Sequence, residues 1–89
     1  PGAKEAAEGF LFTAGGQRNR KAYGDKIVFE IDDFALEEVL YDPQTSGGLL
    51  ISVAAKDGAK MAEEMKAAGI DVACIGEMIE PGDKAIYVR

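Results

Sequence analysis

Short apolar segments, whose periodicity switches between helical and extended patterns, most strongly constrain the fold of this chain. Glycine, proline and charged residues interrupt them, so the longest uninterrupted apolar runs span only a few residues. In order along the chain, the patterns predict a helix, a strand, a helix, a strand, a helix and two strands. This order indicates an α/β (α+β) domain with a mixed four-stranded sheet and helices packed mainly on one face.

Three segments have the spacing of amphipathic helices. Residues 2–12, GAKEAAEGFLF, place apolar side chains at i, i+3, i+4 and i+7. A second helix is expected after an N-cap at Asp32 or Asp33, and Pro43 prevents its continuation. A third is expected from residue 57 or 58 to residue 68, because apolar positions recur there at helical spacing.

Four segments are predicted to be strands. Residues 26–31, KIVFEI, are rich in β-branched and aromatic residues. Residues 47–55, GGLLISVAA, form a continuous apolar run that is typical of a central strand. Residues 70–80 and 84–89 flank the turn sequence Pro-Gly-Asp, so an antiparallel hairpin is predicted. The glycine-rich, polar residues 13–25 are predicted to be an extended loop.

Length and composition indicate one small folded domain of 89 residues, with 47% apolar and 29% charged residues. A net charge of −6 argues against a nonspecific nucleic-acid-binding protein. Cys74 is the single cysteine and histidine is absent, so no metal site is expected within the chain. No apolar run is long enough for a membrane span, and we expect a cytoplasmic protein.

The first candidate binding motif is GGQRN. Gly15 and Gly16 allow close backbone approach, Arg18 offers a planar fork of donors, and Asn19 adds an amide. These are groups that bind phosphate. The alternative is a flexible loop with an exposed arginine, and local sequence alone favours that alternative.

The second candidate motif is DPQTSGG, residues 42–48. Backbone N–H groups, two hydroxyls and an amide could form an anion-binding concavity here. The residues that would face phosphate are Gln44, Thr45, Ser46, Gly47 and Gly48. The structural alternative is a helix stop followed by a strand start. Asp42 could ligate Mg²⁺, although aspartate before proline is also a common turn starter.

Three segments taken together resemble a known family. GGQRNRKAYGD, LYDPQTSGGLLISV and AAGIDVACIGEMI, in this order, resemble the C-terminal end of selenophosphate synthetase, also called selenide, water dikinase. The resemblance covers nearly the whole chain. It implies a domain similar to the C-terminal domain of aminoimidazole ribonucleotide synthetase, within a homodimeric enzyme that makes selenophosphate from selenide, ATP and water with Mg²⁺.

The resemblance also implies which groups lie elsewhere. In that family the reactive Cys or selenocysteine, its neighbouring Lys and the metal-binding Asp residues belong to the N-terminal domain. Residues 1–89 are therefore interpreted as the last part of the C-terminal domain, noncatalytic alone, binding no cofactor by itself. The expected partner is a second copy or a separate N-terminal ATP-binding domain, with no nucleic acid or membrane.

Two points stay open after the resemblance. The family generally has Thr after the glycine pair, whereas Gln17 stands there in this chain and replaces a hydroxyl with a bulkier amide. The alternative function is a freestanding phosphate- or nucleotide-binding module.

Overall fold

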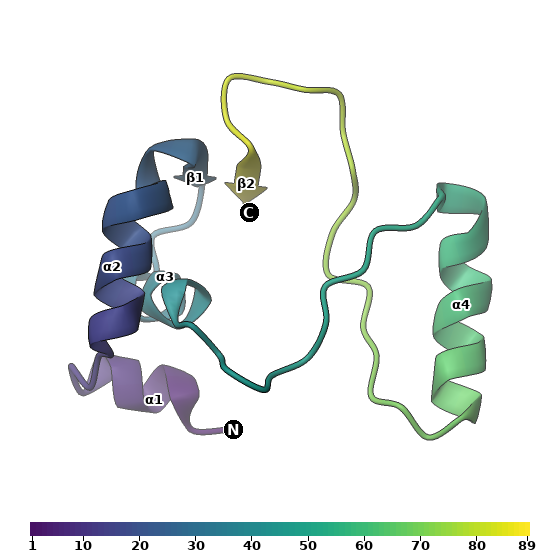
Figure 1. The fold of residues 1–89 in the computed structure, drawn as a ribbon, viewed down its shortest axis with the longest axis horizontal. Helices are drawn as coiled ribbons and strands as arrows, with labels where there is room; N and C mark the ends of the chain where they lie inside the picture. The colour runs from purple at the N-terminus through teal and green to yellow at the C-terminus, as the bar shows by residue number, and fades with distance from the viewer. The chain divides into compact units, whose positions relative to one another are not determined.

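A computed structural model describes all residues 1–89, which divide into two compact units (Figure 1). The first unit comprises Pro1–Gly47 and Pro81–Arg89, and the second comprises Gly48–Glu80. The first unit contains α1 (Ala3–Glu8), α2 (Ala14–Tyr23), the short 3₁₀ helix η1 (Gly24–Lys26), β1 (Ile27–Phe29), α3 (Phe34–Tyr41) and β2 (Ile86–Val88). The second unit contains α4 (Ala55–Ala67). None of these helices has both the length and the apolar character needed to cross a bilayer.

The predicted mixture of helices and strands is confirmed, but the sheet is smaller than expected. It contains only β1 and β2, which run parallel with Ile27 opposite Ile86 and Phe29 opposite Val88. Backbone hydrogen bonds flank the pair: the N–H of Ala85 donates to the carbonyl of Lys26, and that of Glu30 to the carbonyl of Val88. The predicted four-stranded sheet, with helices mainly on one face, is not present.

Two predicted strands are absent from the sheet. Residues 47–55 form no strand, and the last of them begins α4. Residues 71–80 also form no strand, so the antiparallel hairpin with residues 84–89 is wrong. β2 instead takes β1 as its parallel partner, and the backbone of residues 71–80 makes no hydrogen bond to other backbone groups.

Residues 14–23 form a helix rather than the predicted extended loop, and the reason lies at both ends of α2. Thr13 has extended backbone angles, and its Oγ1 accepts a hydrogen bond from the N–H of Gly16, which is N-capping geometry. Arg20 and Lys21 lie in the last turn, where positive charge complements the helix dipole. These local signals, with packing against α3, overcome the cost of two glycines.

The other three helices follow the sequence pattern, except that α1 ends at Glu8 and not at residue 12, because Gly9 and the positive φ of Phe10 end the helix there. Asp33 caps α3, because its Oδ1 accepts from the N–H of Leu36, and the helix ends at Tyr41 before the Asp-Pro pair. α4 begins at Ala55, slightly earlier than predicted, and is followed by Gly69 at a positive φ of 78°. After α1, Phe10 adopts a φ of 60°, a conformation that usually requires glycine.

The centre of the first unit lies where α1 and α2 pack on α3. Ala7, Ala35 and Tyr41 are its buried apolar residues, and Glu38 of α3 is buried beside them. Aromatic rings extend this centre: Phe12 lies edge-on to Phe34 with ring centroids 5.6 Å apart, and Phe29 contacts Tyr41 at 5.7 Å.

Arg20 joins α2 to α3 through two ion pairs and a cation–π contact. Its Nη1 lies 3.0 Å from Oε2 of Glu37, and its Nη2 forms an ion pair with Oε1 of Glu38. The guanidinium also lies over the ring of Tyr41, 4.7 Å from the centroid. Burial lowers the pKa of Arg20, but hydrogen bonds to the two carboxylates outweigh it and the net pKa is raised.

We predict that Arg20→Met destabilises the chain by about 2 kcal/mol, because it leaves the buried Glu38 carboxylate without its cation. The double variant Arg20→Met with Glu38→Leu should recover part of that loss, since no buried charge is left. Urea unfolding followed by circular dichroism measures both.

The control is Lys60→Met, which removes the exposed Lys60–Glu64 pair at 3.8 Å. It should change the free energy of unfolding by less than about 0.5 kcal/mol. Equal losses for Arg20→Met and Lys60→Met would contradict a special role for Arg20.

Candidate functional site

The two glycine-rich motifs meet at the N-terminus of α2. Thr13 Oγ1 donates a hydrogen bond to Oδ1 of Asp42 at 2.6 Å, across 29 positions of sequence. A Cβ atom on Gly15 would lie only 2.7 Å from Cγ of Pro43, so the first turn of α2 packs directly on that proline. The start of the GGQRN helix and the start of DPQTSGG therefore form one surface, which we call the α2 start.

The DPQTSGG motif folds into two consecutive turns. Asp42 Oδ2 accepts from the N–H of Gln44, and the N–H of Gly47 donates to the carbonyl of Gln44 at 2.8 Å. Ser46, at the third position of this second turn, has a φ of 61°, where glycine or asparagine is preferred. The side chains of Thr45 and Ser46 are consequently exposed at the tip.

The amides of the two motifs are used within the structure. Asn19 Nδ2 donates to the carbonyl of Tyr41 at 2.9 Å, and Gln44 Nε2 donates to the carbonyl of Val39 at 3.2 Å. Both therefore donate to carbonyls at the C-terminal end of α3, where that of Val39 also accepts from the N–H of Asp42. In this structure these side chains hold the end of α3.

The remaining predicted residues divide between the two units. Gly16 is buried in the first turn of α2, and Arg18 is exposed on the same helix. Gly47 cannot carry a side chain, because a Cβ there would lie 2.7 Å from the carbonyl oxygen of Gln44. Gly48 is the first residue of the second unit, so the motif spans the boundary between the units.

Some polar groups at the α2 start have the chemistry of an anion site. The N–H groups of the first helical turn have no intrahelical acceptor, and the helix dipole places partial positive charge there. Thr13 satisfies one of them, that of Gly16. The exposed guanidinium of Arg18 and the exposed hydroxyl of Ser46 belong to the same two motifs. Facing a phosphate stays a prediction for these residues.

A magnesium role for Asp42 is not supported by its contacts. Its two carboxylate oxygens accept hydrogen bonds from Thr13 and from the backbone of Gln44. No group of three or more Cys, Asp or Glu side chains lies close enough together to hold a metal ion. The sequence signal for this contact was Thr13 directly before a helix, a capping pattern that the glycine pair obscured.

Gln17 has a specific contact in place of the expected hydroxyl. Its Nε2 donates to Oε2 of Glu38, the buried carboxylate that also pairs with Arg20. The amide reaches across from α2 to α3. The side chain at this position therefore strengthens the contact between the two helices.

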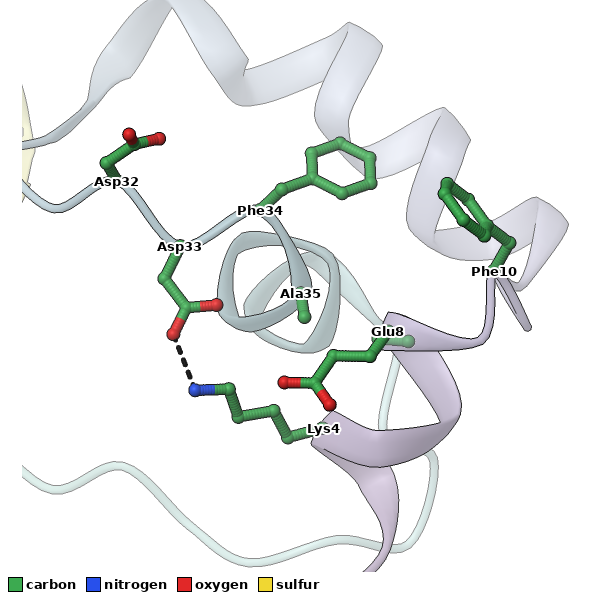
Figure 2. A pocket seen from close by; sticks show the side chains of 8 residues that line it. Lys4, Glu8, Phe10, Asp32, Asp33, Phe34 and Ala35 are labelled. Carbon is green, nitrogen blue, oxygen red and sulfur yellow. Dashed lines mark hydrogen bonds and ion pairs between the residues drawn. The ribbon is translucent and has the colours of Figure 1, made fainter.

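A hollow of about 420 Å³ lies elsewhere, between α1 and the start of α3 (Figure 2). Lys4 Nζ pairs with Oδ2 of Asp33 at 2.7 Å. The hydrogen bond from Lys4, followed by that from the N–H of Leu36, holds the pKa of Asp33 below its usual value, and the same pair raises the pKa of Lys4. Because the paired carboxylate also caps α3, the charges in this hollow serve to position helices.

A second hollow of about 430 Å³ adjoins the end of α3 and the sheet. Its walls are mostly apolar and come from α2, α3, β1 and β2. They include Tyr23, Ile27, Leu40, Tyr41 and Ile86, with Asn19 and Asp42 as polar members. This hollow therefore borders the residue with which DPQTSGG begins.

Comparison with curated proteins finds relatives along nearly the whole chain. A protein of Agathobacter rectalis named selenide, water dikinase is 47% identical over 89 residues, which are 99% of this chain and 26% of the relative. Proteins of the same name from Treponema denticola and Desulfitobacterium hafniense strain Y51 are 46% and 41% identical, over 79% and 93% of this chain. The chain is related in sequence to selenide, water dikinase.

This relationship confirms the resemblance that the three motifs indicate. The chain spans about a quarter of the length of the selenide, water dikinases that it matches, since the matches cover 20–26% of them. No protein-family model matches the chain, and no solved structure matches it.

We predict that Gly15→Ala destabilises the first unit by about 1–3 kcal/mol, because the new methyl group would overlap Pro43 and push it away from α2. The matched control is Gly58→Ala within α4, where the nearest atom would be a methyl of Val53 at 3.8 Å. That change should stabilise α4 by about 0.5–1 kcal/mol. Urea unfolding by circular dichroism separates the two, and stabilisation by Gly15→Ala would contradict the packing of the α2 start.

Proposed function

We propose that residues 1–89 act as the C-terminal part of a selenide, water dikinase, as a structural segment whose reactive groups are supplied by the rest of the protein. The observation that carries this proposal is the similarity along 99% of this chain to 26% of the Agathobacter rectalis protein. The complete protein would make selenophosphate from selenide, ATP and water, with Mg²⁺, in the cytoplasm.

The contacts in the chain support a structural role. Its best-placed charged groups, Arg20 with Glu37 and Glu38, join α2 to α3. Its one cysteine, Cys74, is exposed, and its thiol donates a hydrogen bond to the carbonyl of Gly76. A nucleophile needs an adjacent base or a nearby positive charge, and no such group contacts Cys74.

The proposal extends to the fold. In the complete protein, residues 47–55 and 70–80 would join β1 and β2 as strands of a four-stranded sheet, as in a domain similar to the C-terminal domain of aminoimidazole ribonucleotide synthetase. The composition of these residues supports this, because eight of the twenty are leucine, isoleucine or valine and most of these eight side chains are exposed. The partner is the remaining part of the dikinase or a second copy of the chain.

A chimera tests the structural role. When this chain replaces the matching segment of the Agathobacter rectalis protein, we predict that selenide-dependent ATP consumption stays within about tenfold of the parent, a loss of at most about 1.4 kcal/mol in transition-state stabilisation. The parent without its segment, and this chain alone, should be inactive.

Matched chimeras sharpen that test. Gly15→Ala should lower the activity because it disturbs the α2 start, while Gly58→Ala should leave it unchanged. A folded chimera without activity, or turnover of ATP by the isolated chain, would overturn the proposal.

A second candidate function is a freestanding module that binds phosphate or a nucleotide. The observation that favours it is the meeting of GGQRN and DPQTSGG at the α2 start, through Thr13, Asp42 and Pro43. This arrangement brings helix N–H groups to the motif that carries the exposed hydroxyls of Thr45 and Ser46.

Isothermal titration of the isolated chain with ATP and Mg²⁺ tests this second function. If the α2 start binds phosphate, Arg18→Met should weaken binding by about tenfold or more, because it removes a charge-assisted hydrogen bond. Lys66→Met, on exposed α4, is the matched control. No heat of binding in the unaltered chain would exclude the module and leave the structural role standing.

A further inference from the structure

Aromatic side chains form a contiguous group on the surface of the first unit. Phe10 and Phe34 are 75% and 52% exposed, and Phe12 contacts both of their rings edge-on, with centroid distances of 5.8 and 5.6 Å. Leu11, which follows Phe10, is 74% exposed. Exposed apolar residues that stand singly need no explanation, but a contiguous group of them is typical of an interaction surface. We call Phe10, Leu11, Phe12 and Phe34 the aromatic ridge.

Both ends of the aromatic ridge are held in place within the first unit. At one end, Phe10 has a φ of 60°, a left-handed conformation that a residue with a Cβ atom seldom adopts. At the other end, the guanidinium of Arg20 lies 5.6 Å from the centroid of the Phe34 ring. Strained backbone of this kind is found more often at binding sites than elsewhere.

The hollow of about 420 Å³ adjoins the aromatic ridge and carries an excess of negative charge. Figure 2 shows the Lys4–Asp33 pair on one side of this hollow and the rings of Phe10 and Phe34 on the other. Its charged side chains are one cation and three carboxylates, which gives a net charge of −2, namely Lys4, Glu8, Asp32 and Asp33. Because Lys4 pairs with Asp33, the other two carboxylates form no ion pair within the chain.

The rings and the charge together define the chemistry of a complementary partner. An apolar side chain would cover the aromatic ridge, and a cation would match the carboxylates of the hollow, whereas the net charge of −6 repels an acidic partner. Arginine suits this place best, because its guanidinium both stacks on aromatic rings and forms paired hydrogen bonds with carboxylates. Arg20 does both within this unit, since it contacts the Phe34 ring and pairs with Glu37.

We propose that the aromatic ridge and the adjoining hollow dock a peptide segment of a partner protein that carries arginine beside an apolar side chain. The apolar side chain lies on the aromatic ridge, and the guanidinium enters the hollow, where Glu8 and Asp32 neutralise its charge. Pockets that bind small ligands have volumes of roughly 300–1,000 Å³, so this hollow has room for one such side chain. The proposal goes beyond the proposed function, because these residues lie outside the α2 start.

A tripeptide titration of the full 89-residue chain tests the proposal. The probe is Leu-Arg-Leu with both ends blocked, added to ¹⁵N-labelled chain and followed by amide chemical shifts. We predict saturable shifts at residues 8–12 and 32–35. The matched peptide with norleucine in place of arginine should bind about tenfold more weakly or less, because it cannot form a charge-assisted hydrogen bond.

Charge variants locate the guanidinium. Glu8→Gln combined with Asp32→Asn should weaken binding of the arginine peptide by about tenfold or more, since both unpaired carboxylates of the hollow are lost. The matched control, Glu63→Gln with Glu64→Gln on α4, removes the same charge from an exposed helix. It should change the affinity by less than about twofold, because salt screens distant charges.

A variant of the aromatic ridge separates binding from stability. Phe10→Gly removes the exposed ring and places at φ 60° a residue that adopts this conformation freely. We predict that binding of the arginine peptide is lost, while the urea midpoint of the chain is unchanged or higher. Unaltered binding by Phe10→Gly, or by the Glu8 and Asp32 double variant, overturns the proposal.

Other occupants of the aromatic ridge would appear as distinct results. Equal binding of the arginine and norleucine peptides would show an apolar surface without preference for a cation. Nuclear Overhauser contacts from the Phe10 ring to residues 48–80 in the free chain would show that the second unit covers it, and self-association that Phe10→Gly abolishes would show a second copy there. Each of these results overturns the proposal. Because the measurements use neither selenide nor ATP, their failure leaves the chimera test of the proposed function untouched.

Discussion

The contact of Arg20 with Glu37 and Glu38 is the interaction on which the first unit depends. Its buried apolar residues are few, namely Ala7, Ala35 and Tyr41, so area alone provides little cohesion between its helices. The guanidinium supplies two ion pairs and a cation–π contact with Tyr41, all directed from α2 to α3. In this small unit one long side chain holds the helices together, a role that a larger apolar core has in larger domains.

Local sequence was sufficient for the elements whose signals are local. The Asp33 cap, the stop before Pro43 and the apolar spacing of α4 depend on residues within a few positions of each other, and α3 and α4 followed them. α2 was mispredicted because the glycine pair indicated a loop. The contacts that outweigh the glycines, from Gln17 and Arg20 to α3, join residues 17 to 21 positions apart.

The candidate site shows the same limit. That DPQTSGG ends a helix was predictable from proline alone, but its contact with Thr13 spans 29 positions and has no local signature. Gly15 shows why a glycine alone does not identify a phosphate site. Without a Cβ atom, its backbone could approach a phosphate closely, but in the structure Pro43 occupies that position. The family relationship identifies the motif, while the geometry shows that packing already accounts for Gly15 and Gly47.

The composition of a segment indicates that it can form a strand, but not which strand it pairs with. This explains why the predicted sheet had more strands than the observed one. Residues 47–55 and 71–80 keep the apolar character of strands, and β1 and β2 each keep an unpaired edge. In the curated relatives, about three quarters of the sequence lies outside the match, so further strand neighbours have a natural source there.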